Sequence, residues 1–308
     1  MAQSPNENAI MRLAINTSET LSDTSLSKTV SSFRLAIFLG ILLVVSGCVH
    51  LALFAIQGTM WKGPLSLRKP TLFGISGGLT IWSIVWLMTQ LRPRKSDRLL
   101  ASSLAIGLFI EVTLITVQTW RGVASHFNRA TSIDAAIEFA MLGLILLVSC
   151  GIVYLSFRTF RLRNIDPAMV IAIRGGMWLL TLSCGLGILT SILGEISISA
   201  GRTYELWGRA GVLKFPHGVA LHAIQMLPAI AWMARSLGVS GAVRIMQSAL
   251  ASQVLFLVYA IWQTIQGRDR FDWDTVGGSI LGVAILLGLF PAVAILQGLI
   301  QYLGRKTT

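Results

Sequence analysis

Charged residues are scarce in this chain of 308 residues. They make up 12% of the sequence, whereas hydrophobic residues make up 54%. A typical soluble domain has about twice that fraction of charged residues, so the composition argues against a soluble globular fold. We therefore expect an integral membrane protein built from apolar helices, with the lipid bilayer as its main partner.

Acidic residues are the scarcer of the two charged kinds. The chain has 13 Asp and Glu against 25 Lys and Arg, which gives a formal net charge of +12. Nucleic-acid-binding proteins also show such an excess, but they gather it in one patch or stripe. Here the basic residues form short clusters between apolar runs, so we expect contact with anionic lipids and no nucleic acid partner.

Several motifs that would define a function are also missing. The three cysteines, Cys48, Cys150 and Cys184, lie inside apolar runs without a CxxC spacing, which predicts buried free thiols. The chain has no CxxCH haem-attachment motif, no nucleotide-binding loop and no Ser-His-Asp arrangement. These absences leave open whether the protein is an enzyme.

Long apolar runs are what the sequence has instead. Runs of about 20 residues, the length that crosses a hydrocarbon core, predict an all-α polytopic helical bundle of about eight transmembrane helices. No fixed-period repeat interrupts this pattern. The predicted spans are 34–56, 71–90, 99–119, 132–157, 167–195, 216–236, 242–266 and 276–303.

The predicted organisation is one membrane domain with two short tails. Residues 1–33 are polar and lack the order of a signal peptide, so we expect a disordered cytoplasmic tail. Residues 34–303 form the transmembrane bundle, and 304–308 form a short basic cytoplasmic tail. The clusters "RPRKSDR" (92–98) and "RTFRLR" (158–163) place both termini in the cytoplasm of a bacterial-type membrane, because basic residues favour the inner side.

Polar residues gather at one depth in this topology. At about 1.5 Å of rise per residue, four of them lie roughly 9–12 Å below the extracytoplasmic surface: His50, Glu111, Glu138 and His222. Three more lie at the outer rim: His126, Asp134 and His217. Because ionisable groups inside a membrane are costly and face the bundle interior, this clustering predicts a polar site near the extracytoplasmic leaflet.

The histidines allow three interpretations. His50, His217 and His222 are candidate ligands of a haem iron or another transition metal on facing helices. They are also compatible with hydrogen bonds between helices or with a proton relay. His222 shares a helix face with Gln225, whereas His217 and His222 are five residues apart and cannot form an HExxH-type pair.

The remaining candidates support this site. The loop "RGVASHFN" (121–128), with Arg121, His126 and Asn128, is predicted either to bind a ligand or to lie at the lipid headgroups. Asp134 follows Ser132 at a predicted helix start, which favours a capping role, while the deeper Glu138 is a candidate ligand or proton carrier.

Two further features lie away from the histidines. Arg174 is predicted to reach the cytoplasmic interface or to pair with a buried acid. The connection 196–215 is predicted to contain a short interfacial helix around Tyr204 and Trp207.

Three functions fit these observations. The first is a membrane redox protein with a bound haem or metal, which would need a quinone or a separate redox partner. The second is a proton- or cation-coupled transporter that uses the same residues. The third is a scaffold or lipid-binding protein without catalysis. The sequence names neither a substrate nor an oligomeric state.

Overall fold

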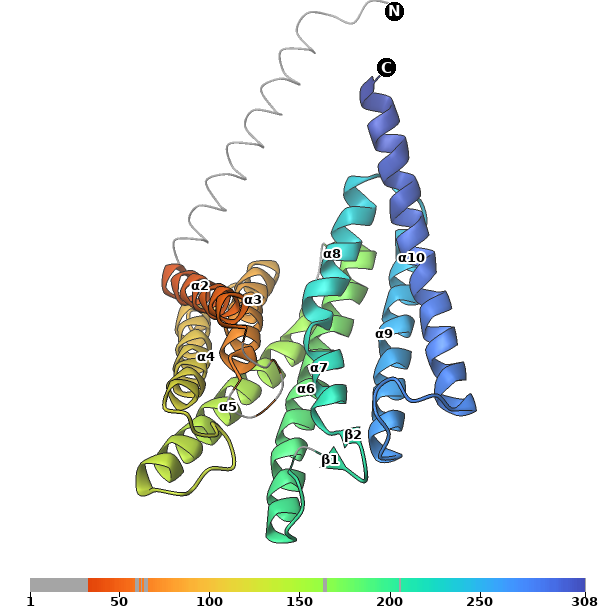
Figure 1. Ribbon diagram of the computed structural model, residues 1–308. Coiled ribbons are helices and arrows are strands. Elements are labelled where there is room, and N and C mark those ends of the chain that lie inside the picture. The colour runs from red at the N-terminus through yellow and green to blue at the C-terminus, as the bar shows by residue number, and fades with distance from the viewer. Residues whose placement is uncertain are drawn as a thin grey trace, which may run out of the picture.

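A computed structural model of the protein describes residues 33–58, 61, 63, 66–162, 165–204 and 206–307, with side chains to residue 305. The predicted tail over 1–33 therefore lies outside the described residues, except for Phe33. Within the described part, seven helices are long and apolar enough to cross a membrane. The predicted class, an all-α polytopic membrane bundle, is confirmed (Figure 1).

The helices follow the predicted spans closely. Their bounds are α2 (Arg34–Gln57), α3 (Arg68–Gln90), α4 (Asp97–Trp120), α5 (Ser132–Arg158), α6 (Pro167–Ser199), α7 (Lys214–Leu221), α8 (Ala223–Ser236), α9 (Ala242–Ile265) and α10 (Thr275–Thr307), with a 3₁₀ turn η1 (Thr159–Arg161) after α5. Since α10 continues to Thr307, residues 304–307 of the expected basic tail are helical.

The sixth predicted span is not one continuous helix. It divides into α7 and α8 at His222, whose φ and ψ of −93° and 5° interrupt the helix. The break packs against α6, where a Cβ on Gly176 would lie 2.8 Å from the Cα of Ile224. This close backbone approach places the interruption inside the bundle, where irregular backbone is tolerated in a membrane protein.

The predicted interfacial helix around Tyr204 and Trp207 is wrong. Strands β1 (Leu206–Trp207) and β2 (Gly211–Val212) form an antiparallel hairpin there, with Trp207 opposite Gly211. Gly208 has a φ of 62°, which favours glycine. The hairpin packs on the end of α9, because a Cβ on Gly211 would collide with the carbonyl oxygen of Thr264.

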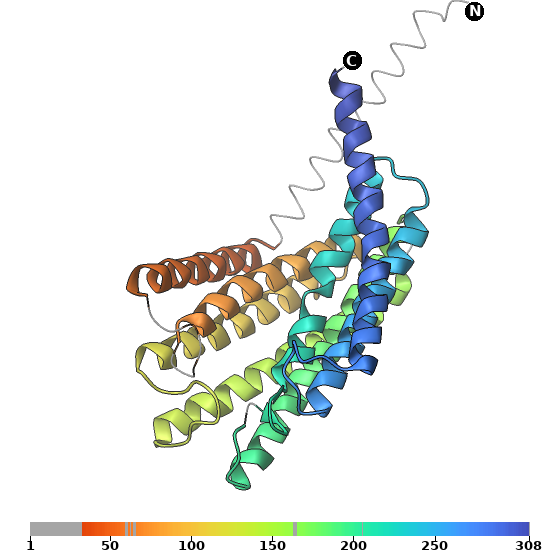
Figure 2. The ribbon, with the colours of Figure 1, turned by 45° about the vertical axis from the view of Figure 1, so that its right-hand side comes forward.

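The connections define two ends of the bundle. The connections α2–α3, α4–α5, α6–α7 and α9–α10 lie at one end, which we call the His126 end. The connections α3–α4, α5–α6 and α8–α9 lie at the other, which we call the Arg158 end. Figures 1 and 2 show α2, α3 and α4 on one side of α6, and α9 and α10 on the other. One apolar core is formed mainly by the helices from α2 through α6. A second is formed by the helices from α6 through α9, so α6 belongs to both.

Glycine allows α2 and α3 to approach each other closely. A Cβ on Gly74 would lie 2.8 Å from the Cα of Gly47, and one on Gly78 would lie 2.5 Å from the carbonyl oxygen of Gly40. Small residues four apart permit this kind of backbone contact between transmembrane helices. The two helices are therefore packed backbone against backbone.

A buried ion pair fixes the Arg158 end. The guanidinium of Arg158 pairs with both carboxylate oxygens of Asp97 and donates to the carbonyl oxygen of Arg92 at 2.8 Å. Both side chains are more than nine-tenths buried. The pair joins the end of α5 to the start of α4, and its low exposure makes the loss of either partner costly.

Candidate functional site

His50 is a structural histidine in this fold. The indole N–H of Trp120 donates to its Nε2 at 2.9 Å, and its Nδ1 lies 2.7 Å from the carbonyl oxygen of Ser46. Because an indole can only donate, the hydrogen-bond network assigns the proton to Nδ1, which donates to Ser46. Both ring nitrogens are therefore occupied, Nδ1 within α2 and Nε2 in joining α2 to the end of α4.

His217 joins α7 to α6. Its Nδ1 donates to the carbonyl oxygen of Ser183 at 2.8 Å, and the Ser183 hydroxyl donates to the carbonyl oxygen of His217 at 2.9 Å. The ring also lies against Gly187, where a Cβ would approach it to 3.2 Å. His222, at the helix break, lies within electrostatic reach of His217 and next to Gln225.

The three expected metal ligands do not form one site. His50 is held at the His126 end of α2, whereas His217 and His222 lie on the α7–α8 segment. Among the residues that the structure describes, no group of three or more His, Cys, Asp or Glu side chains is placed to hold a metal ion. The arrangement thus gives the haem or metal hypothesis no geometric support.

Asp134 caps the start of α5. Thr131 is the N-cap and accepts from the backbone N–H of Asp134 at 3.1 Å, so the cap is one residue before the expected Ser132. The Asp134 carboxylate accepts from Gln118 at 3.0 Å and pairs with Arg121 at 2.7 Å. This network joins the end of α4 to the start of α5. The candidate residues Asp134 and Arg121 therefore both have partners within the fold.

Glu138 belongs to a second ion-pair group at the same end. Arg129 lies 3.3 Å from Glu138 on α5 and 3.0 Å from Glu195 on α6. Its guanidinium also lies over the ring of Phe139, 5.2 Å from the centroid. Arg129 therefore bridges α5 and α6, and one oxygen of Glu138, Oε2, is buried without a hydrogen-bond partner among the described residues.

The loop after α4 is folded against α3 and α6. His126 Nδ1 lies 3.0 Å from the Ser125 hydroxyl, which accepts from Lys69 of α3 at 3.1 Å. Phe127 has a φ of 57° and its ring fills the space beside Gly194 of α6. Asn128 stabilises the loop internally through the carbonyl oxygen of Ala124 and the backbone N–H of Ala130.

His126 is neutral at physiological pH. Burial, together with the positive charges of Lys69 and Lys214, lowers the pKa of His126 to about 4. Each factor disfavours the imidazolium form, because the ring loses hydration and faces two like charges. The histidine therefore serves as a hydrogen-bonding group in this loop, with its charged form disfavoured.

Glu111 differs from the other acids on helices α4 to α6, which are Asp97, Asp134, Glu138 and Glu195, because it lacks an ion pair in the described part of the chain. It is 6% exposed on α4, and its Oε2 is buried without a hydrogen-bond partner there. Seven residues before Gln118, it lies on the same core-facing side of α4, about 10 Å further into the bundle. An ionised carboxylate at such a place costs about 2.5–3.5 kcal/mol on insertion scales, so proton uptake favours its burial.

A belt of polar groups continues from Glu111 across the bundle. The Cys184 thiol on α6 lies next to Ser149 of α5 and within electrostatic reach of Glu111. Its neighbour Ser183 is bonded to His217 of α7. We call these five residues the polar belt. It crosses α4, α5, α6 and α7, and it reaches the helix break at His222.

Gln225 lies just beyond this break, on α8. Its amide nitrogen and oxygen are both buried without hydrogen-bond partners among the described residues. Buried polar groups in native structures are normally paired, so such an amide is available to form hydrogen bonds with a water molecule or a ligand. The prediction that Gln225 belongs to a polar site stays a prediction.

Arg174 lies at the opposite end of α6. Its Nε donates to the carbonyl oxygen of Thr159 at 3.2 Å, and its Nη2 donates to that of Phe160 at the same distance. The guanidinium thereby caps the end of α5 and η1, as a cation near a helix C-terminus does favourably. It reaches the Arg158 end and contributes to the α5–α6 connection.

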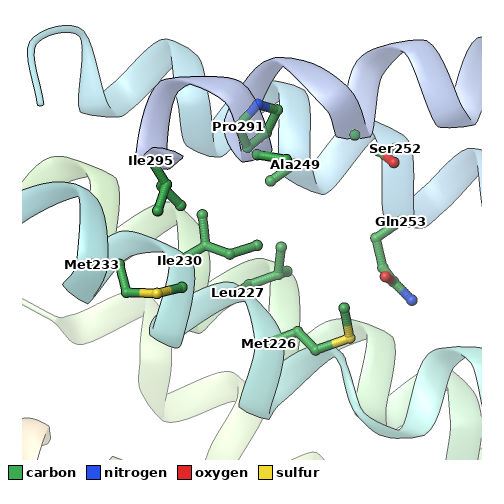
Figure 3. A pocket seen from close by; sticks show the side chains of 11 residues that line it. Met226, Leu227, Ile230, Met233, Ala249, Ser252, Gln253, Pro291 and Ile295 are labelled. Carbon is green, nitrogen blue, oxygen red and sulfur yellow. The ribbon is translucent and has the colours of Figure 1, made fainter. Parts of the chain in front are cut away.

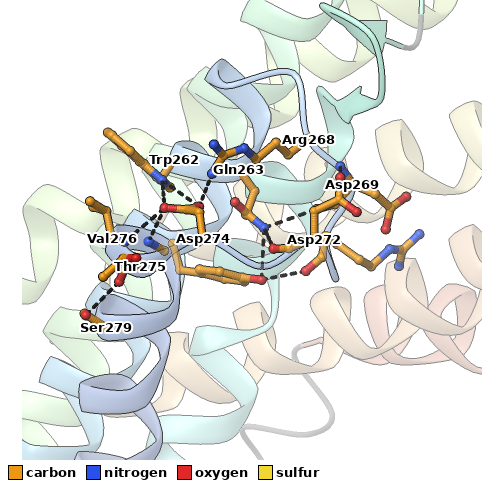
Figure 4. A network of polar contacts seen from close by, with 12 residues as sticks. Trp262, Gln263, Arg268, Asp269, Asp272, Asp274, Thr275, Val276 and Ser279 are labelled. Atoms are coloured by element: carbon orange, nitrogen blue, oxygen red, sulfur yellow. Dashed lines mark hydrogen bonds and ion pairs between the residues drawn. The ribbon is translucent and has the colours of Figure 1, made fainter.

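The connection between α9 and α10 holds a polar network that sequence reasoning missed (Figure 4). Gln263 is fully buried and donates to the carbonyl oxygens of Asp272 at 2.6 Å and Asp269 at 3.2 Å. Asp274 caps α10 through the backbone N–H of Gly277 at 2.9 Å and pairs with Arg268. The signal was present in "RDRFDWD" (268–274), whose three aspartates alternate with basic and aromatic residues.

Hydrogen bonds explain the electrostatics of this connection. The backbone N–H of Gly277, followed by the side chains of Arg268 and Trp262, holds the pKa of Asp274 below its ordinary value. All three groups favour the carboxylate form. The network therefore stabilises the connection between α9 and α10, and all of its hydrogen bonds to Asp274 can form at neutral pH, where this carboxyl group is ionised.

Comparisons with known proteins give no relative from which to assign this arrangement. No protein-family model matches the chain, and neither a curated protein nor a solved structure matches it. The class that the fold defines is a multi-pass helical membrane protein, and its function has to be inferred from its own residues.

Proposed function

We propose that the protein is a proton-coupled membrane carrier in which Glu111 is the proton-binding group. The observation that carries this proposal is the burial of the Glu111 carboxyl group without an ion-pair partner among the described residues. Acidic residues in this situation mark proton relays in pumps and transporters. The other acidic candidates near the His126 end, Asp134 and Glu138, are paired with arginines.

The polar belt supplies groups that exchange protons. A carboxyl group, hydroxyls, a thiol and an imidazole follow one another from Glu111 to His217, and each can donate and accept. The Nε2 of His217 forms no hydrogen bond among the described residues, so this nitrogen is available for a proton. The belt supports proton movement between the core of α4 and the interrupted sixth span.

The break between α7 and α8 supports the carrier part of the proposal. Discontinuous helices with exposed backbone groups form substrate sites in many secondary transporters. Here the break at His222 adjoins both the polar belt and the buried amide of Gln225, which lies beside the His222 ring. The affinity of a solute that binds at this place would therefore depend on the protonation state of the polar belt.

Charge movement after a pH jump tests the proposal without a known solute. The purified protein, reconstituted on a solid-supported membrane, is expected to give a transient current when protons bind. Glu111→Gln should remove at least nine-tenths of this charge, because the amide cannot take up the proton. Glu195→Gln is the matched control, since Glu195 is 40% exposed and paired with Arg129. An unchanged signal in Glu111→Gln would contradict the proposal.

A further inference from the structure

A cavity of about 350 Å³ lies between α8, α9 and α10 (Figure 3). Met226, Ile230 and Met233 of α8 form one wall, and Pro291 and Ile295 of α10 form another. Its volume is within the range of small-molecule sites, roughly 300–1,000 Å³. The lining is mainly apolar, with Ser252 and Gln253 of α9 as its polar members.

Small residues and a proline keep this space open. Pro291 has no N–H, so the carbonyl oxygen of Leu287 loses its partner within α10. Ser248 of α9 donates to that oxygen at 2.8 Å, and Ser252 donates to the carbonyl oxygen of Ala284 at 2.7 Å. These two bonds hold α10 against α9 beside the cavity. The short side chains in the lining, such as Ala249 and Ala292, do not fill the space between the helices.

The cavity opens sideways toward the bilayer. Met226, at its rim, is 52% exposed, and Ala292 on α10 is also exposed. The most apolar 18-residue stretch of α10 is only 11% buried within the protein. Molecules dissolved among the lipid chains therefore have direct access to the cavity.

The depth of the cavity indicates which leaflet of the bilayer can supply its ligand. Ala249 is seven residues from the start of α9 and Met233 is three residues from the end of α8, while Met226 and Gln253 lie deeper, so the cavity extends from about 5 Å to about 16 Å from the Arg158 end. Arg244 is one turn before Ser248, on the side of α9 that meets α10. It is exposed and forms no ion pair within the described residues. Its charge suits a lipid phosphate at this depth.

We infer that this cavity binds one acyl chain of an anionic phospholipid from the leaflet at the Arg158 end, with the lipid phosphate on Arg244. The inference rests on the apolar lining, the lateral opening and the position of one cation at the headgroup end. It is independent of the proposed proton coupling, because no residue of the polar belt lines the cavity.

Native mass spectrometry of the detergent-purified protein tests this assignment with phosphatidylglycerol and phosphatidylcholine as probes. The wild type should bind one phosphatidylglycerol in preference to phosphatidylcholine. Arg244→Gln should weaken phosphatidylglycerol binding about fivefold and phosphatidylcholine binding less, because the choline cation already offsets the charge of that lipid's phosphate. Arg235→Gln is the matched control: Arg235 is also exposed at this end, but it lies two residues after Met233 and so faces away from the cavity.

A second pair of variants tests the chain site itself. Ala292→Phe should fill the cavity and abolish binding of either lipid, whereas Val293→Phe, on the neighbouring lipid-facing position, should retain it. Thermal unfolding of both variants checks that they remain folded. Equal binding of the two lipids by the wild type, or retention of lipid by a folded Ala292→Phe variant, would overturn the inference.

Discussion

The two sides of α6 are packed very differently. On one side, α2 to α5 are joined by backbone contacts at glycine and by the buried pair of Arg158 and Asp97. On the other, α10 is held to α9 by two serine hydroxyls and leaves a cavity beside them. The most apolar 18-residue stretches of α3 and α4 are 56% and 44% buried and that of α10 is 11% buried, while those of α2, α5 and α9 lie between, at 28%, 28% and 33%. The unpaired carboxyl group lies on the tightly packed side, and the lipid-accessible cavity lies on the loose one.

Loss of the buried ion pair should have the largest effect on stability. Asp97→Ala leaves the Arg158 guanidinium buried without its partner, so we expect a loss of about 3–5 kcal/mol in the free energy of unfolding. Unfolding in mixed micelles measures it. The double variant Asp97→Leu, Arg158→Leu should lose less than the single one, and an equal loss in both would argue against the buried charge as the cause.

Acid should destabilise the loop that contains His126. The folded pKa of about 4 lies below the value of about 6.5 expected in an unfolded chain. The unfolded state therefore binds the proton first, and stability falls as the pH drops from about 6.5 to about 4, by up to about 3 kcal/mol. Unfolding measured across this range should show this loss in the wild type and not in His126→Gln, on top of any pH dependence that the two proteins share through other groups such as Glu111.

Glycine substitutions compare the two sides directly. Gly78→Val places a side chain against the carbonyl oxygen of Gly40, so we expect a loss of about 1–3 kcal/mol. Gly282→Ala in α10 meets open space and should be neutral or slightly stabilising, because alanine favours the helix. Similar losses at both positions, measured by thermal unfolding, would contradict the difference in packing.

The smallest effect is expected at the contact of α9 with α10. Ser248→Ala removes one hydrogen bond to Leu287, and such bonds between membrane helices contribute about 0.6 kcal/mol on average. Chemical unfolding of this variant should show a loss of that size. A loss as large as that of Asp97→Ala would mean that α10 is held more firmly than its contacts indicate.

The spans and the fold class were predictable from the sequence because run length and composition determine them. The break at His222 was not, since it depends on the approach of Gly176 on another helix. The hairpin at 206–212 depends on packing against the end of α9. In both cases a contact between distant segments overrides a local pattern.

The candidate residues were identified individually, but their partners were not. Depth alone placed His50 with Glu111 and His222, whereas the bond from Trp120 assigns His50 to the contact between α2 and α4. The pair of Asp97 and Arg158 joins residues 61 positions apart. Helix pairing and side-chain direction decide these contacts, and a single sequence contains neither.

The protonation state of Glu111 is the most direct test of the proposed function. Infrared spectroscopy of the reconstituted protein should show, at neutral pH, the C=O band of a protonated carboxylic acid that Glu111→Gln removes and Glu195→Gln retains. That result would establish a proton-binding carboxyl group within the membrane. A spectrum in which no such band depends on Glu111 would show that this carboxyl group is ionised at neutral pH and would contradict the proposal.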